Sequence, residues 1–133
     1  MHLPAPPRRL RAAAALTLAA VWAAFALAPV AARSTPDALP EVALSDLPKE
    51  VREVTAAIRN GGPFRYERDG VVFGNRERIL PAEPRGYYHE YTVPTPGVSS
   101  RGARRIVCGG PARAPHACWY TADHYQSFRR IRE

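Results

Sequence analysis

Residues 86–93, Gly-Tyr-Tyr-His-Glu-Tyr-Thr-Val, are the stretch that most strongly decides the fold. Aromatic and β-branched residues fill it, and a Pro-Arg-Gly run before it and Pro94 after it bound it, as is typical of a strand. Side chains alternate between the two faces of a strand, so Tyr88, Glu90 and Thr92 share one face. A carboxylate in the middle of such a strand departs from the usual apolar pattern.

Further short strands are predicted around this one. A brief apolar run at 71–73 follows an Asp-Gly turn dipeptide, and strand-like composition recurs at 103–108, 117–121 and 128–131. A Gly-Gly-Pro turn region separates the strands at 103–108 and 117–121. The chain therefore changes from one helical pattern to a series of strands without internal repeats.

A single helix is predicted over 49–59, before the strands. Pro48 suits a first helical position, and Val51, Val54 and Ile58 fall on one face. The Asn-Gly-Gly-Pro run at 60–63 ends the helix. One helix followed by consecutive strands predicts an α+β fold, in which the N-terminal helix packs on a twisted antiparallel sheet.

The N-terminus has the pattern of a secretory signal peptide. Three arginines lie within residues 1–11, a nearly continuous apolar run covers 12–27, and Val-Ala-Ala ends at position 32. We expect a signal peptide at 1–32, a flexible linker at 33–43 and one domain at 44–133, which makes the mature protein extracellular. The alternative is an uncleaved membrane anchor, although the apolar run is shorter than the ~20 residues of a spanning helix.

The chain has two cysteines, Cys108 and Cys118. In an exported protein such a pair more often forms a disulfide than a metal site, and no suitably spaced histidine pair accompanies it. The ten-residue separation suits opposite positions on a hairpin. We expect a disulfide here, and two buried free thiols are the alternative.

Charged residues form a possible site on the strands. The chain carries 19 basic and 12 acidic residues, a net charge of +7, which favours encounters with polyanions. Arg101 and Arg105 are four residues apart, so in a regular strand they project from one face. Together with Glu90 they form either a structural ion-pair cluster or part of an anion site.

His124, in Thr-Ala-Asp-His-Tyr just past a predicted strand, favours the second interpretation. A carboxylate and an imidazole on either side of an arginine-lined space provide a general base and a general acid around an anion. These are the groups that cleavage of a phosphodiester by a ribose hydroxyl requires. A surface histidine without a role is the alternative for His124 alone.

Several motifs resemble one protein family. The stretches Asp69-Gly-Val-Val-Phe-Gly-Asn-Arg-Glu77, Gly86-Tyr-Tyr-His-Glu-Tyr-Thr-Val93, Arg101-Gly-Ala-Arg-Arg-Ile106 and Asp123-His-Tyr-Gln-Ser-Phe128 are similar, in order and spacing, to those of the small secreted bacterial guanyl-specific ribonucleases, the group that includes barnase. The resemblance runs from about Leu44 to Ile131. It implies the microbial ribonuclease fold and an endoribonuclease that cleaves single-stranded RNA after guanosine.

The resemblance also implies residue roles. Glu90 matches the general base and His124 the general acid, and Arg101 and Arg105 match the arginines that hold the scissile phosphate. Glu77 matches the carboxylate that accepts hydrogen bonds from guanine. The remaining substrate-binding positions are Phe73 beside the base, the backbone of Gly74, Asn75 and Arg76, and Tyr125 near the phosphate and base.

The implied reaction forms a 2′,3′-cyclic phosphate and then a 3′-phosphate, with neither metal ion nor cofactor. We expect a monomer without stable membrane association after signal cleavage, and the family association suggests a small acidic intracellular inhibitor. A catalytically idle RNA-binding module of the same fold is the alternative. The sequence differs from the family pattern at two places. Gly74 stands where some relatives have a larger polar residue, and the segment between the two cysteines is longer than in close relatives.

Overall fold

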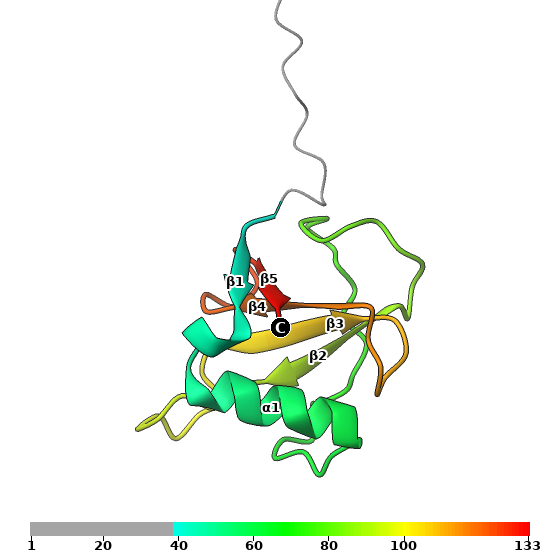
Figure 1. Ribbon diagram of the computed structural model, residues 1–133. Coiled ribbons are helices and arrows are strands. Elements are labelled where there is room, and N and C mark those ends of the chain that lie inside the picture. The colour runs from blue at the N-terminus through cyan, green and yellow to red at the C-terminus, as the bar shows by residue number, and fades with distance from the viewer. Residues whose placement is uncertain (1–38) are drawn as a thin grey trace, which may run out of the picture. The chain divides into compact units, whose positions relative to one another are not determined.

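The computed structural model describes residues 39–133, which form one helix against a five-stranded sheet (Figure 1). The elements in chain order are β1 (Glu41–Ala43), the 3-10 helix η2 (Leu44–Asp46), α1 (Lys49–Asn60), β2 (Tyr88–Thr92), β3 (Arg105–Gly109), β4 (Ala117–Thr121) and β5 (Arg129–Arg132). The sheet order is β1-β5-β4-β3-β2. The pairs from β2 to β5 are antiparallel, whereas β1 lies parallel to β5.

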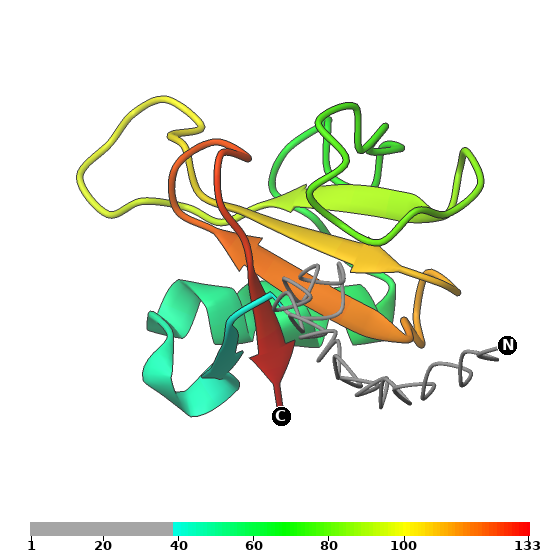
Figure 2. The same ribbon diagram turned by 90° about the horizontal axis from the view of Figure 1, so that it is seen from above.

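Helix α1 covers one face of the sheet, as the view from above also shows (Figure 2). Val51 and Ile58 are at most 2% exposed and pack with strand residues such as Tyr91, Ile106 and Tyr120. Gly61 ends the helix with a φ of 76°, and the N–H groups of residues 61 and 62 donate to carbonyls in the last turn. The predicted helix and its apolar stripe are thereby confirmed.

The opposite face of the sheet carries a second apolar cluster and the predicted site residues Glu90 and Arg105. Tyr88, Val107 and Trp119 alternate with the residues that face α1, and they pack against Leu80 and Phe128 from long connections. Val107 pairs with Glu90, and Arg105 pairs with Thr92 and Thr121. Register therefore places Glu90 and Arg105 on the same face, away from the helix.

The α+β prediction is confirmed, with three differences in detail. Residues 41–43, assigned to a linker, form β1, which makes the sheet mixed; a three-residue strand is too short to show a period. The 71–73 run is not a full strand; it lies along β2 through the Val72–His89 bridge and two backbone hydrogen bonds. Arg101 precedes β3, so it is not part of a regular strand. The expected signal peptide at 1–32 and residues 33–38 lie outside the described residues.

Cys108 and Cys118 form the expected disulfide, between directly opposed residues of β3 and β4. Their Cα atoms are 4.1 Å apart. The bridge faces α1, so it lies on the far side of the sheet from Glu90. Within 39–133, no helix has the length and apolar character needed to cross a bilayer.

Candidate active site

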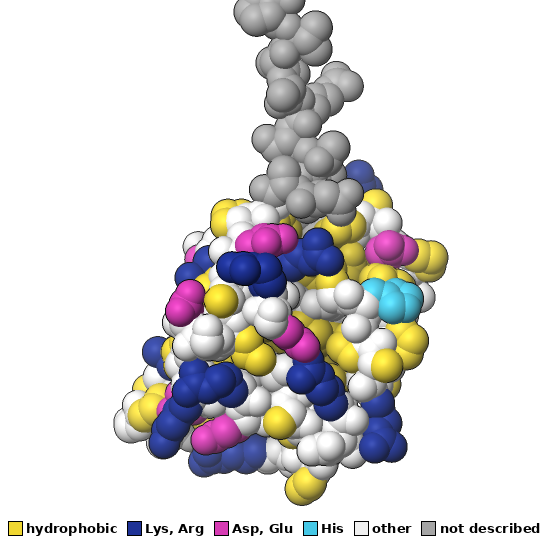
Figure 3. All heavy atoms as spheres, in the orientation of Figure 1, with side chains coloured by type: hydrophobic (Ala, Val, Ile, Leu, Met, Phe, Trp, Pro, Cys, Tyr) yellow, Lys and Arg dark blue, Asp and Glu magenta, His cyan; other side chains and the backbone are white. Residues whose placement is uncertain are grey.

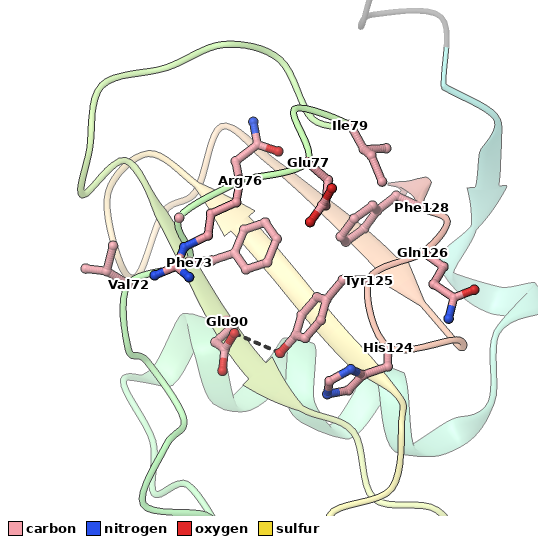
Figure 4. A pocket seen from close by; sticks show the side chains of 12 residues that line it. Val72, Phe73, Arg76, Glu77, Ile79, Glu90, His124, Tyr125, Gln126 and Phe128 are labelled. Atoms are coloured by element: carbon pink, nitrogen blue, oxygen red, sulfur yellow. Dashed lines mark hydrogen bonds between the residues drawn. The ribbon is translucent and has the colours of Figure 1, made fainter.

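A pocket of about 780 Å³ opens on the sheet face that α1 leaves uncovered (Figure 4). Three segments build it: the 72–79 connection, Glu90 of β2, and the 124–128 connection after β4. Eight of the ten residues predicted to act on substrate line this pocket: Phe73, Gly74, Asn75, Arg76, Glu77, Glu90, His124 and Tyr125. Arg101 and Arg105 lie beside it.

Glu90 is the buried anion of the pocket, with a side chain only 8% exposed. Its Oε2 accepts a 2.7 Å hydrogen bond from the Tyr125 hydroxyl. Its Oε1 faces two guanidinium groups, with Nη2 of Arg101 at 3.9 Å and Nε of Arg68 at 4.0 Å. One carboxylate oxygen is therefore fixed by Tyr125, and the other is left in a positive field.

The two predicted phosphate-binding arginines are held by different means. Arg101 donates from Nε and Nη2 to Oγ1 of Thr92, at 3.1 and 2.7 Å, which orients it from a loop. Arg105 is 2% exposed, and its Nη1 donates to the carbonyls of Gly102 and Arg104. The Nε of Arg105 is buried and has no hydrogen-bond partner among residues 39–133. A buried donor of this kind favours an anionic ligand as its partner.

His124 is placed by a tightly hydrogen-bonded loop. The backbone N–H of His124 donates to the carbonyl of Ala103 at 3.1 Å, and this bond joins the loop after β4 to the segment before β3. Asp123 accepts hydrogen bonds from Thr121 and Ser127, and these bonds, the one from the Ser127 hydroxyl above all, lower its pKa to about 2. The loop supports φ values of 56° at His124 and 71° at Tyr125, which non-glycine residues rarely adopt.

The Tyr125 ring forms the floor between the two ends of the pocket. It stacks on Phe73 with ring centroids 5.1 Å apart, and the guanidinium carbon of Arg105 lies 5.9 Å from its centroid. Burial first, and then its hydrogen bond to Glu90, raise the pKa of Tyr125 to about 12. The hydroxyl therefore keeps its proton and acts as a donor to Glu90.

The far end of the pocket is a turn held by Asn75. The Asn75 amide donates to the carbonyl of Leu80 at 3.0 Å and accepts from the Leu80 N–H at 3.2 Å. Asn75 itself has a φ of 47°. Its side chain is thus occupied within the turn, which leaves the backbone N–H groups and the exposed Glu77 carboxylate to meet a ligand. In Figure 4, Glu77 and Glu90 lie on opposite sides of the Phe73 ring.

Sequence reasoning missed several contributors to the site. Val72, Ile79, Gln126 and Phe128 line the pocket, and Arg68 lies next to Glu90. The Asp-Gly dipeptide at 69–70 marked a turn, and that turn brings Arg68 to β2. No local pattern distinguishes Gln126 from an ordinary surface residue.

The positive charge is not gathered into one large patch on the face shown in Figure 3. Basic side chains are spread there among acidic ones. Examples of paired charges are Arg59 with Glu133 and Arg132 with Glu41. On this face the net positive charge is therefore not concentrated on one surface.

Known proteins match this chain over nearly the whole described part. A family model described as ribonuclease matches residues 30–132. Guanyl-specific ribonuclease Sa3 of Kitasatospora aureofaciens is 46% identical, with 95% of each chain covered, and guanyl-specific ribonuclease Sa of the same organism is 51% identical over 68% of this chain and 91% of its own.

Solved structures show the same similarity. The structure of ribonuclease Sa2 with guanosine-2′-cyclophosphate is 45% identical, has a TM-score of 0.64 and covers 71% of this chain and 96% of its own. A structure of ribonuclease Sa2 complexes with mononucleotides has a TM-score of 0.67 at 44% identity, over 71% and 95% of the two chains. This chain, with its helix-backed sheet and its arginine-flanked acidic pocket, belongs to the ribonuclease family.

Proposed function

We propose that this protein is a guanine-preferring endoribonuclease, which cleaves single-stranded RNA through a 2′,3′-cyclic phosphate. The observation that carries the proposal is the placement of Glu90 and His124 in one pocket, with Arg101 and Arg105 beside it and Glu77 farther along. The relatives named guanyl-specific ribonucleases, and the ribonuclease Sa2 structure with guanosine-2′-cyclophosphate, support it.

In the first step Glu90 acts as the general base. Its Oε2 is occupied by Tyr125, so Oε1 takes the proton of the ribose 2′-hydroxyl. The 2′-oxygen bonds to phosphorus and the bond from phosphorus to the 5′-oxygen breaks, while His124 gives its proton to that leaving oxygen. Arg101 and Arg105 stabilise the negative charge that grows on the phosphoryl oxygens.

The second step runs in the opposite direction. His124, now neutral, takes a proton from water, whose oxygen attacks the cyclic phosphate. The bond from phosphorus to the 2′-oxygen breaks, and Glu90 returns its proton to that oxygen, which leaves a 3′-phosphate. DNA lacks the 2′-hydroxyl and is therefore not cleaved by these groups.

Guanine is read at the turn that Asn75 holds. The Glu77 carboxylate accepts hydrogen bonds from N1–H and the exocyclic amine of guanine, and backbone N–H groups of 74–76 donate to O6. Adenine presents the opposite pattern of donors and acceptors at these positions. Phe73 and Tyr125, which stack on each other, together provide an aromatic surface, with Phe73 beside the base and Tyr125 near the phosphate and base. Reading of an unpaired base by its edge, with aromatic contacts, is usual in RNA recognition.

The direct test is product analysis on short RNAs that contain one guanosine, in the presence of excess chelator. We expect cleavage after guanosine to be much faster than after any other base, a cyclic phosphate that converts to a 3′-phosphate, and loss of activity in Glu90→Ala and His124→Ala. His89→Ala is the matched control, because His89 neighbours Glu90 but lies on the other face of β2. Salt-sensitive RNA binding without cleavage would instead support an idle binding module.

We also propose how the protein is exported, in what state it works and how the producing cell is protected from it. Residues 1–32 act as a signal peptide, the following residues lead into the ribonuclease domain, whose first strand is β1 at 41–43, and the mature enzyme works outside the cell as a monomer. A small acidic protein inside the cell protects the producer. N-terminal sequencing of protein from culture medium tests the cleavage site, and a copurified acidic partner from cell extract tests the inhibitor.

A further inference from the structure

We propose that Arg68 is a further substrate-binding residue, which contacts the scissile phosphate from the outer edge of β2. The inference rests on the proposed function, because it assigns a third guanidinium to the phosphate that Arg101 and Arg105 bind. The observation behind it is that Nε of Arg68 lies 4.0 Å from Oε1 of Glu90.

The fold fixes the segment that carries Arg68. The Asp69 carboxylate accepts from the N–H of Thr92 at 2.6 Å and from the N–H of Tyr66 at 3.1 Å. The Gly70 N–H donates to the carbonyl of Glu90 itself at 2.8 Å. The turn is therefore joined by its backbone to the strand that bears the general base, and the position of Arg68 beside Glu90 follows from these bonds.

The side-chain N–H groups of Arg68 are available to a ligand. Its side chain is 65% exposed, and among residues 39–133 it makes no hydrogen bond, since 4.0 Å is beyond hydrogen-bonding range. Arg101 uses donors on Thr92, and Arg105 uses Nη1 on two backbone carbonyls. An arginine has five N–H donors in a planar fork that matches phosphate oxygens. Of the three guanidiniums near Glu90, Arg68 has the most capacity left for a ligand.

The direction of approach makes Arg68 complementary to the other two. β2 is the end strand of the sheet, and the 70–73 segment runs along its outer edge. Arg101 and Arg105 come from the inner side, from the segment before β3 and from β3 itself. A phosphate next to Glu90 is thus flanked by guanidiniums from both sides.

Electrostatic repulsion between Glu90 and the substrate also favours a third guanidinium near the phosphate. The ionised Glu90 must act close to a phosphodiester of the same sign, and that repulsion rises further in a partly buried site. As the 2′-oxygen attacks, negative charge increases on the phosphoryl oxygens. A guanidinium held between the carboxylate and the phosphate offsets the repulsion and stabilises this charge.

The test compares Arg68→Gln with Arg65→Gln. Arg65 belongs to the same connection and its loss changes the charge equally, but it lies over Tyr66 and lines a separate hollow with Lys49. With guanylyl-3′,5′-uridine, whose only phosphate is the scissile one, we expect kcat/KM to fall about tenfold in Arg68→Gln, as for one charge-assisted contact. Arg68→Lys should recover part of the loss, and Arg65→Gln should stay within about twofold of wild type.

Binding measurements separate phosphate contact from folding. Affinity for guanosine 3′-monophosphate should fall about tenfold in Arg68→Gln, while affinity for guanosine stays unchanged, because only the first ligand has the phosphate. Wild-type affinity for both ligands in Arg68→Gln, with unchanged kcat/KM, would overturn the inference. So would a loss confined to a trinucleotide that adds a phosphate 5′ of guanosine. A wild type that binds the monophosphate but does not cleave would contradict the proposed function and not this contact.

Discussion

The hydroxyl of Tyr125 donates a 2.7 Å hydrogen bond to Oε2 of Glu90, across the pocket between two segments 35 residues apart in the chain. The bond selects which oxygen of the proposed base is free, and it joins the loop of the proposed acid to the strand of the base. Because the raised pKa of Tyr125, about 12, keeps the hydroxyl protonated, it remains a hydrogen-bond donor to Glu90 at neutral and moderately alkaline pH.

Tyr125→Phe removes that donor and keeps the ring that stacks on Phe73. We expect kcat/KM on guanylyl-3′,5′-uridine to fall about tenfold, the value of one hydrogen bond to a charged group. Steady-state kinetics at neutral pH measures the loss. Tyr87→Phe, which removes a hydroxyl bonded to the exposed His116, is the control and should retain full activity. Equal activity of both variants would remove Tyr125 from the mechanism.

Glu77→Gln should damage base choice more than chemistry. The amide has one acceptor in place of two and loses the charge, so cleavage after guanosine should fall about 100-fold while the slow cleavage after adenosine stays unchanged. The measurement is the ratio of kcat/KM for guanylyl-uridine and adenylyl-uridine. Glu83→Gln, at another hollow of the surface, is the matched control. A parallel loss on both substrates would mean that Glu77 does not read the base.

Asp123 makes the loop of His124 sensitive to acid. Its hydrogen bonds, first with the Ser127 hydroxyl, lower its pKa from 3.8 to about 2 in the folded protein. A carboxyl with a lowered folded-state pKa stabilises the protein above its unfolded pKa, and this contribution is lost as the pH falls from about 4 to about 2. Thermal melting should therefore show a smaller drop in Tm over this interval in Asp123→Asn than in wild type. An identical drop would mean that the Asp123 bonds do not contribute to stability.

The Cys108–Cys118 bridge should contribute to stability and not to chemistry, because it lies on the helix-facing side of the sheet. Closing a loop of this length stabilises a protein by about 2–3 kcal/mol through the unfolded state. The double variant Cys108→Ala and Cys118→Ala should lose that amount in urea unfolding, and kcat/KM at 25 °C should stay within about twofold of wild type. A large loss of activity in a folded variant would show that the bridge also shapes the pocket.

The sequence by itself determined the elements whose signal is local. The apolar stripe of α1 with its Gly-Gly end, the aromatic strand around Glu90 and the hairpin of Cys108 and Cys118 all depend on neighbours in the chain, so their periods and turn residues predict them. The placement of Glu90 away from the helix also follows from alternation. The match of motifs to known ribonucleases supplied the roles of Glu77 and Tyr125, which no period indicates.

Tertiary structure alone decided what depends on distant segments. β1 is a strand only because β5 offers it a parallel partner, and Arg101 reaches Glu90 from a loop and not from a strand. Arg68 carries no motif, and it lies beside Glu90 because Asp69 binds the backbone of Thr92, 23 residues away in the chain. The hydrogen bond of Tyr125 to Glu90 is decided in the same way. Local chemistry specifies which side chains exist, whereas long-range backbone pairing decides which of them meet.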